Sequence, residues 1–134
     1  NFLWAVKNNN GLTFWLALDH CNEFNGGLTY FKGSHKYGLL NHESSFAPGT
    51  SQKITKSELE KIENECELIT PELNPCDVLI HHCLIIHGSS QNKSKKNRRG
   101  FTIQFKDKKS IYDQSLLSNY EKKLNEQLKM RNQI

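Results

Sequence analysis

The sequence predicts a mainly β fold, a sandwich or barrel of short strands, with one inserted helix and one helix near the C-terminal end. Short runs rich in aromatic and branched residues alternate with turn sequences through residues 11–105, and helix signals occur in only two places. With 134 residues, the chain is long enough for one hydrophobic core and not for two.

Five short runs have the composition of β-strands, at residues 12–18, 28–31, 67–70, 77–82 and 100–105. The first follows the turn sequence Asn-Asn-Asn-Gly, and the second follows a Gly-Gly pair. The fourth is a continuous apolar run that resumes at residues 84–86. The fifth alternates apolar and polar side chains, which is the pattern of a half-buried strand. Residues 37–53 are irregular and are expected to form a long loop.

Two segments are expected to be helical. Ser57 and Glu60 have the spacing of a capping box, so a short helix should begin there and end at about Glu65. Towards the end of the chain, apolar residues recur mostly at helical spacing. Residues 111–134 are therefore expected to form one amphipathic helix that follows a β domain of residues 1–110.

The composition is that of an ordinary globular protein. Hydrophobic residues make up 36% of the chain and charged residues 24%, which argues against a disordered chain. The net charge of +4 comes largely from a loop at residues 93–99. This loop lacks the basic stripe and stacking aromatics of a nucleic-acid-binding protein, so no nucleic-acid partner is expected. No apolar run approaches the roughly 18 residues that span a bilayer, so no membrane partner is expected either.

The four cysteines, at positions 21, 66, 76 and 83, include no C-x-x-C pair. Their wide spacing and the absence of a recognisable signal peptide in the given sequence fit reduced thiols and predict a cytoplasmic location. The sequence predicts no particular oligomeric state.

Six histidines are candidate metal ligands, and one of them stands apart. Three lie in turns or loops. His81 and His82 are adjacent, so they face opposite sides of a strand and are interpreted as structural. His87 closes an apolar run and precedes Gly88, and Arg98 begins the returning strand across a hairpin-like loop. Neutral imidazole suits iron, and a guanidinium binds a carboxylate through two hydrogen bonds. On spacing alone, a strand-end histidine and a surface arginine remain an open alternative.

Three blocks of sequence carry a family resemblance: LTFWLALD at 12–19, NGGLTYFKGSHK at 25–36 and CDVLIHHCLIIHGSSQNKS at 76–94, which leads to the Arg-Arg pair at 98–99. Their order and spacing resemble those of the phytanoyl-CoA dioxygenase family. In that family a strand with a tryptophan leads to an Asn-Gly turn and a Gly-Ser-His turn, and a second motif ends in His-Gly-Ser. The resemblance covers most of residues 11–105.

The resemblance implies a double-stranded β-helix core (jelly-roll or cupin-like), incomplete at its N-terminal side, with an iron(II) site of two histidines and one carboxylate. His87 matches the distal histidine ligand, and Arg98 matches the arginine that holds the far carboxylate of 2-oxoglutarate. Ser89 matches an accessory hydrogen-bond partner. Trp15 matches a position near the cosubstrate, although a core role explains it nearly as well. Arg99, next in the strand, should point away from the pocket.

The activity that the resemblance implies uses Fe(II), 2-oxoglutarate and O2 to hydroxylate an unactivated C–H bond of a small organic or lipid-like substrate. The family's other two iron ligands lie in a His-x-Asp motif upstream of the tryptophan strand. No His-x-Asp occurs in this sequence, which begins at Asn1 without a methionine. We therefore expect that the natural protein extends upstream and that the 134-residue chain alone is inactive. The alternative is a non-enzymatic β-barrel binding module that keeps a pocket without the metal.

Overall fold

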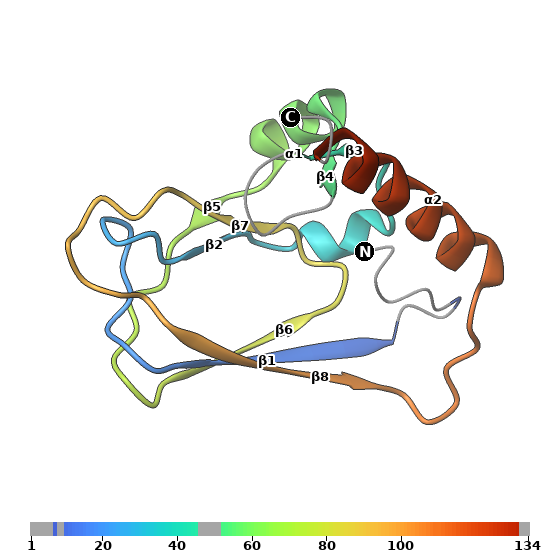
Figure 1. Ribbon diagram of the computed structural model, residues 1–134. Helices are drawn as coiled ribbons and strands as arrows, with labels where there is room; N and C mark the ends of the chain where they lie inside the picture. The colour runs from blue at the N-terminus through green and yellow to red at the C-terminus, as the bar shows by residue number, and fades with distance from the viewer. Residues whose placement is uncertain (1–6, 8–9, 46–51, 132–134) are drawn as a thin grey trace.

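A computed structural model describes residue 7 and residues 10–45 and 52–131 of the chain, except for the side chains of residues 130 and 131. Two antiparallel three-stranded sheets form the centre of the molecule (Figure 1). One has the order β6-β1-β8 (Val78–His82, Gly11–Ala17, Gly100–Lys106), and the other has the order β5-β2-β7 (Leu68–Ile69, Leu28–Phe31, His87–Ser89). The mainly β class and all five predicted strands are confirmed.

Strand β1 contributes the centre of the core, and its alternate side chains point to opposite faces of the sheet. Thr13, Trp15 and Ala17 are buried on the inner face, with Trp15 only 7% exposed. Leu28 of β2 and Leu79 of β6 pack against the core cluster, which consists of Trp15, Ala17, Cys21 and Leu73. The inner face of β1 therefore meets the second sheet through a small apolar cluster.

The outer face of the β6-β1-β8 sheet is apolar and exposed. Phe14 of β1 packs edge to face on Phe105 of β8, with ring centroids 5.0 Å apart. Phe101, Ile103 and Phe105 are 45–54% exposed, and every residue of β8 is classed as exposed. The predicted half-burial of residues 100–105 is therefore wrong, because the described part of the chain places no segment over this face.

The segment expected to be one long loop, residues 37–53, is partly ordered. After the short 3-10 helix η2 (Ser34–Tyr37), β3 (His42–Ser44) and β4 (Gln52–Ile54) form an antiparallel hairpin. Glu43 and Lys53 face each other in it, with an Nζ–Oε1 distance of 3.2 Å. The Pro-Gly pair at 48–49 lies outside the described residues.

Helix α1 (Lys56–Glu65) is confirmed, but the capping box is wrong. Because β4 ends at Ile54, the helix begins directly after Thr55, one residue before Ser57. No side-chain hydrogen bond caps its first turn. Glu60, which was expected to reach back to Ser57, instead lies 3.5 Å from the Lys56 ammonium.

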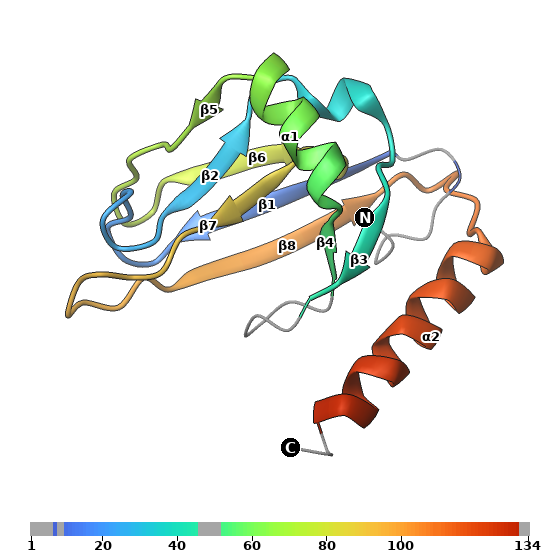
Figure 2. The same cartoon turned by 90° about the horizontal axis from the view of Figure 1, so that it is seen from above.

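The C-terminal helix α2 (Gln114–Arg131) is also confirmed, and Figures 1 and 2 show it at one side of the molecule, away from the two central sheets. It meets the β3 region through polar contacts: Lys123 donates to the His42 carbonyl at 2.9 Å, and Gln127 donates to the Ser45 carbonyl. Its inner side therefore mixes polar and apolar side chains. Whether it forms a unit separate from a β domain of residues 1–110 stays a prediction.

Two further expectations concern cysteines and membranes. No disulfide joins any two of the four cysteines, which fits the reduced thiols that their spacing suggests. No helix in the described part of the chain combines the length and the apolar character that crossing a bilayer requires.

A substitution at Gly100 tests the packing of the core tryptophan. A Cβ at this position would lie 2.0 Å from Cζ2 of Trp15, so Gly100→Ala must displace the indole. We expect the free energy of unfolding to fall by about 1–3 kcal/mol, the usual cost of overpacking a core, as measured by urea denaturation of the full-length protein.

Gly88→Ala is the matched control. Its Cβ would meet only the Thr29 hydroxyl, at 3.9 Å, so its stability should stay within about 0.5 kcal/mol of the wild type. Equal stabilities for the two variants would show that Trp15 does not lie against Gly100.

Candidate functional site

His87 is the first residue of β7, and its imidazole is oriented by the backbone. Nδ1 lies 3.0 Å from the carbonyl oxygen of Ile85, so a protonated Nδ1 donates to that oxygen. Nε2 has no hydrogen-bond partner among the described residues. A histidine that donates from one ring nitrogen to a backbone carbonyl presents the other nitrogen's lone pair, which is the usual arrangement of a metal-binding imidazole.

Two further rings surround His87, one from each sheet. Tyr30 of β2 is the backbone partner of His87, and their rings stack with centroids 5.9 Å apart. His81 of β6 lies across the interior, 5.1 Å from the His87 ring and 5.2 Å from the Tyr30 ring. The Tyr30 hydroxyl and Nδ1 of His81 are 3.1 Å apart. A hydrogen bond therefore joins the two sheets beside His87.

Burial sets the protonation states of this pair. It raises the pKa of Tyr30 to about 12, and it is the larger cause that lowers the pKa of His81 to about 4, ahead of electrostatic repulsion from a protonated His87. Both groups are therefore neutral at pH 7. A neutral tyrosine hydroxyl can donate a hydrogen bond, and the unprotonated ring nitrogen of a neutral histidine can accept it.

Trp15 and Arg98 form a second contact in the interior. The Arg98 guanidinium lies over the Trp15 ring, 5.9 Å from its centroid. Arg98 is half-buried, and no described carboxylate pairs with it. Burial raises the pKa of the Cys21 thiol, and the positive charge of Arg98 offsets part of that rise. A half-buried guanidinium with an aromatic floor and no internal counter-ion fits the carboxylate of a bound ligand.

Arg99 lies elsewhere and has a partner of its own. It binds Asp19 through two side-chain hydrogen bonds, of 2.9 and 2.8 Å, and its backbone N–H donates to the same carboxylate at 2.7 Å. These bonds lower the pKa of Asp19 to about 2. Arg99 is thus occupied in a structural ion pair, whereas Arg98 is not.

The strand register relates the two contacts. His81 is paired with Thr13, and Leu79 is paired with Trp15. Both pairs lie on the inner face of the sheet, two residues apart, which is about 7 Å along a strand. Ser89 lies two residues after His87, opposite Leu28, which packs on the Trp15 cluster. His87 and Ser89, at the two ends of β7, therefore lie on the same face of that strand.

One predicted relationship is wrong. His87 and Arg98 do not face each other across a hairpin, because β7 pairs with β2 and β8 pairs with β1, in different sheets. The connecting residues cross from one sheet to the other. The relative position of the two side chains is therefore set by the packing of the sheets and not by a shared strand pair.

The sequence did not single out Tyr30, and it indicated a structural role for His81. The adjacent histidines were expected to face opposite sides, and they do: His81 meets Tyr30, whereas His82 lies 5.5 Å from the His35 ring. Period two places His81 on the same face as Leu79, but only the sheet register shows that this is the inner face. Among the described residues, no three His, Cys, Asp or Glu side chains come together as a metal site.

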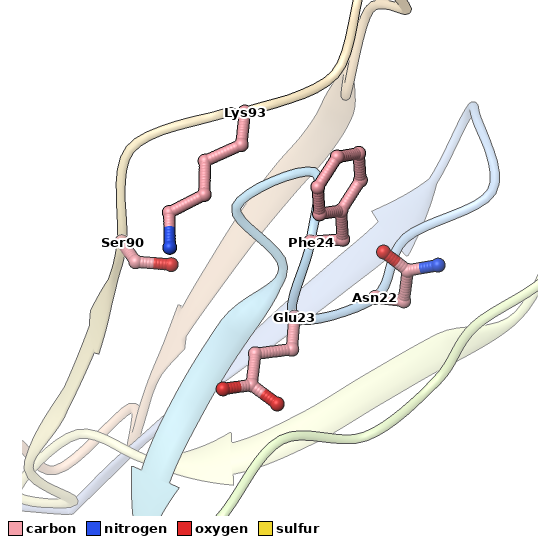
Figure 3. Close-up of a pocket in the computed structure, with 5 residues that line it drawn as sticks. All are labelled: Asn22, Glu23, Phe24, Ser90 and Lys93. Carbon is pink, nitrogen blue, oxygen red and sulfur yellow. The ribbon is translucent and has the colours of Figure 1, made fainter.

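A shallow hollow of about 490 Å³ lies outside this region (Figure 3). The turn before β2 lines one side of it and the loop after β7 lines the other; its lining residues are Asn22, Glu23, Phe24, Ser90 and Lys93. None of the residues predicted to bind iron or cosubstrate lines it.

The family model described as phytanoyl-CoA dioxygenase (PhyH) matches residues 1–100. Human peroxisomal phytanoyl-CoA dioxygenase is 30% identical over 91 residues, which are 68% of this chain and 27% of that protein. A probable alpha-ketoglutarate-dependent hypophosphite dioxygenase of Stutzerimonas stutzeri is 30% identical over 107 residues, which are 76% of this chain and 37% of that protein.

A solved structure shares the fold. EctD from S. alaskensis, determined with 2-oxoglutarate and 5-hydroxyectoine, has a TM-score of 0.60 and 19% sequence identity, over 78% of this chain and 35% of EctD. The chain thus spans about a quarter to a third of the length of these proteins. Because the family model covers well over half of its 134 residues, the chain belongs to the phytanoyl-CoA dioxygenase (PhyH) family.

Proposed function

We propose that the full-length polypeptide carrying this chain is an Fe(II)- and 2-oxoglutarate-dependent dioxygenase with a double-stranded β-helix core. It would hydroxylate an unactivated C–H bond of a small organic or lipid-like molecule. One observation carries the proposal: Arg98, without a described carboxylate partner, lies over Trp15, whose strand position is two residues from Thr13, the partner of His81.

The residues present fit part of such a site. Nε2 of His87 would bind the iron, and the guanidinium of Arg98 would hold the far carboxylate of 2-oxoglutarate by two parallel hydrogen bonds. Ser89 would add a hydrogen bond from its hydroxyl, and Trp15 would form an apolar floor that excludes water. Iron, when bound with 2-oxoglutarate and O2, supplies the oxidising chemistry that no side chain can provide.

The second candidate function is a non-enzymatic binding module. It is favoured by the lack of a three-residue metal site among the described residues and of a His-x-Asp motif in the sequence. Against it stands the arrangement of His87, whose Nδ1 is held by a carbonyl while Nε2 is left without a described partner. In our proposal the two remaining ligands come from outside the described part of the chain.

Replacement of the proposed ligand separates the two functions. In the full-length protein, His87→Ala should abolish Fe(II)-dependent conversion of 2-oxoglutarate to succinate, because one of three metal ligands is lost. The control is His20→Ala, whose imidazole binds Glu72 at the surface, 2.9 Å away, and which should keep wild-type turnover. Full activity of His87→Ala would refute the ligand assignment, and absence of turnover in the wild type would favour the binding module.

The adjacent arginines provide a matched pair. Arg98→Gln removes the proposed cosubstrate anchor and should weaken 2-oxoglutarate binding by about 2 kcal/mol or more, roughly a 30-fold rise in Kd. Arg99→Gln breaks the Asp19 ion pair and should leave that Kd unchanged. Isothermal titration of 2-oxoglutarate into the metal-loaded protein measures both. A larger loss in Arg99→Gln than in Arg98→Gln would contradict the assignment.

A further inference from the structure

The proposed function uses His87 and leaves its two ring neighbours without a role. Tyr30 is 6% exposed, and its side chain extends from one sheet to bond His81 of the other. A polar pair buried between two sheets carries a desolvation cost that two apolar side chains would not. Because the pair lies beside the candidate ligand His87, it can affect how that ligand is held.

His87 needs orientation from its surroundings. Its side chain is exposed, so packing alone restrains it little. One hydrogen bond, to the Ile85 carbonyl, restrains the ring. A single bond leaves the imidazole free to swing about that axis, and a metal ligand must be held within a narrow angular range.

Tyr30 and His81 supply the missing restraint. The Tyr30 ring stacks on the His87 ring at an interplanar angle of 26°, and the His81 ring meets His87 from the opposite sheet at 42°. The hydrogen bond between Tyr30 and His81 fixes these two rings relative to each other. Tyr30 is also the backbone partner of His87 in the sheet, so strand pairing and ring stacking join the same two residues.

We propose that Tyr30 and His81 are positioning residues: their hydrogen bond ties β2 to β6 and holds the His87 imidazole at the angle at which Nε2 binds iron. This inference rests on the proposed function, since it takes His87 as an iron ligand. Partners outside the ligand sphere that orient a metal-binding histidine commonly change metal affinity by about 10- to 100-fold.

Conservative variants of the full-length protein test the pair. Tyr30→Phe keeps the stacked ring and removes only the hydroxyl, and His81→Phe keeps a ring and removes the acceptor. His81→Asn places a side-chain oxygen near the position of Nδ1 and can still accept from Tyr30. The measurements are the Kd of Co(II), the visible absorption bands of the bound Co(II), and the midpoint of thermal unfolding of the metal-free protein.

We expect the Co(II) Kd to rise about tenfold in Tyr30→Phe and His81→Phe, with altered Co(II) bands, and to return towards the wild-type value in His81→Asn. The unfolding midpoint of the metal-free variants should change by about 3 °C or less. Unchanged Co(II) affinity and bands in both Phe variants would overturn the inference. So would a loss of affinity in His81→Asn as large as that in His81→Phe.

His87→Ala in the same titration separates this inference from the proposed function. If His87→Ala abolishes Co(II) binding while Tyr30→Phe and His81→Phe bind as the wild type does, only the positioning role fails. If His87→Ala binds Co(II) as tightly as the wild type, the ligand assignment fails, and the positioning role fails with it.

Discussion

The close approach of Trp15 to the backbone of Gly100 is the constraint on which the rest of the structure depends. The indole occupies the volume where any other residue at position 100 would place its Cβ. This brings β8 against β1 at the start of their pairing, where Ala17 faces Gly100. It also leaves one face of the indole for Arg98, two residues before Gly100. Core packing and the proposed cosubstrate site thus share one side chain.

The second constraint is polar and lies between the sheets. The interior of this small sandwich contains an apolar cluster around Trp15. Two residues further along β1 and β6 lie the rings of Tyr30, His81 and His87. The first cluster stabilises the fold and borders the proposed cosubstrate anchor, and the second contains the proposed iron ligand. Residues from three strands, β2, β6 and β7, meet in the second cluster, so its geometry depends on how the two sheets pack.

Local pattern was enough to predict β1, β2, β5, β6 and β8, because aromatic and branched runs between turn residues leave few alternatives. The run at 12–18 and the alternation of His81 and His82 are clear cases. Local pattern did not predict the short strands β3, β4 and β7. Local pattern failed where a long-range contact decides the outcome. Whether Phe101 and its neighbours are covered depends on what lies over the sheet. The pattern around Ser57 likewise gave no sign that β4 ends at Ile54 and that the helix already begins at Lys56.

In the candidate site too, local sequence pattern indicated some residues and long-range contacts decided the rest. His87 and Arg98 stood out by their positions on either side of a loop, and the family resemblance implied their roles. Their spacing also suggested a hairpin that does not exist. Tyr30 escaped notice because a tyrosine in a short strand is unremarkable until its hydroxyl is seen 3.1 Å from a histidine of the other sheet. The most direct test of the account is an anaerobic crystal structure of the full-length protein with Fe(II) and 2-oxoglutarate. We predict iron bound to Nε2 of His87 and the far carboxylate of 2-oxoglutarate on Arg98; iron bound without His87, or a cosubstrate held by Arg99, would contradict it.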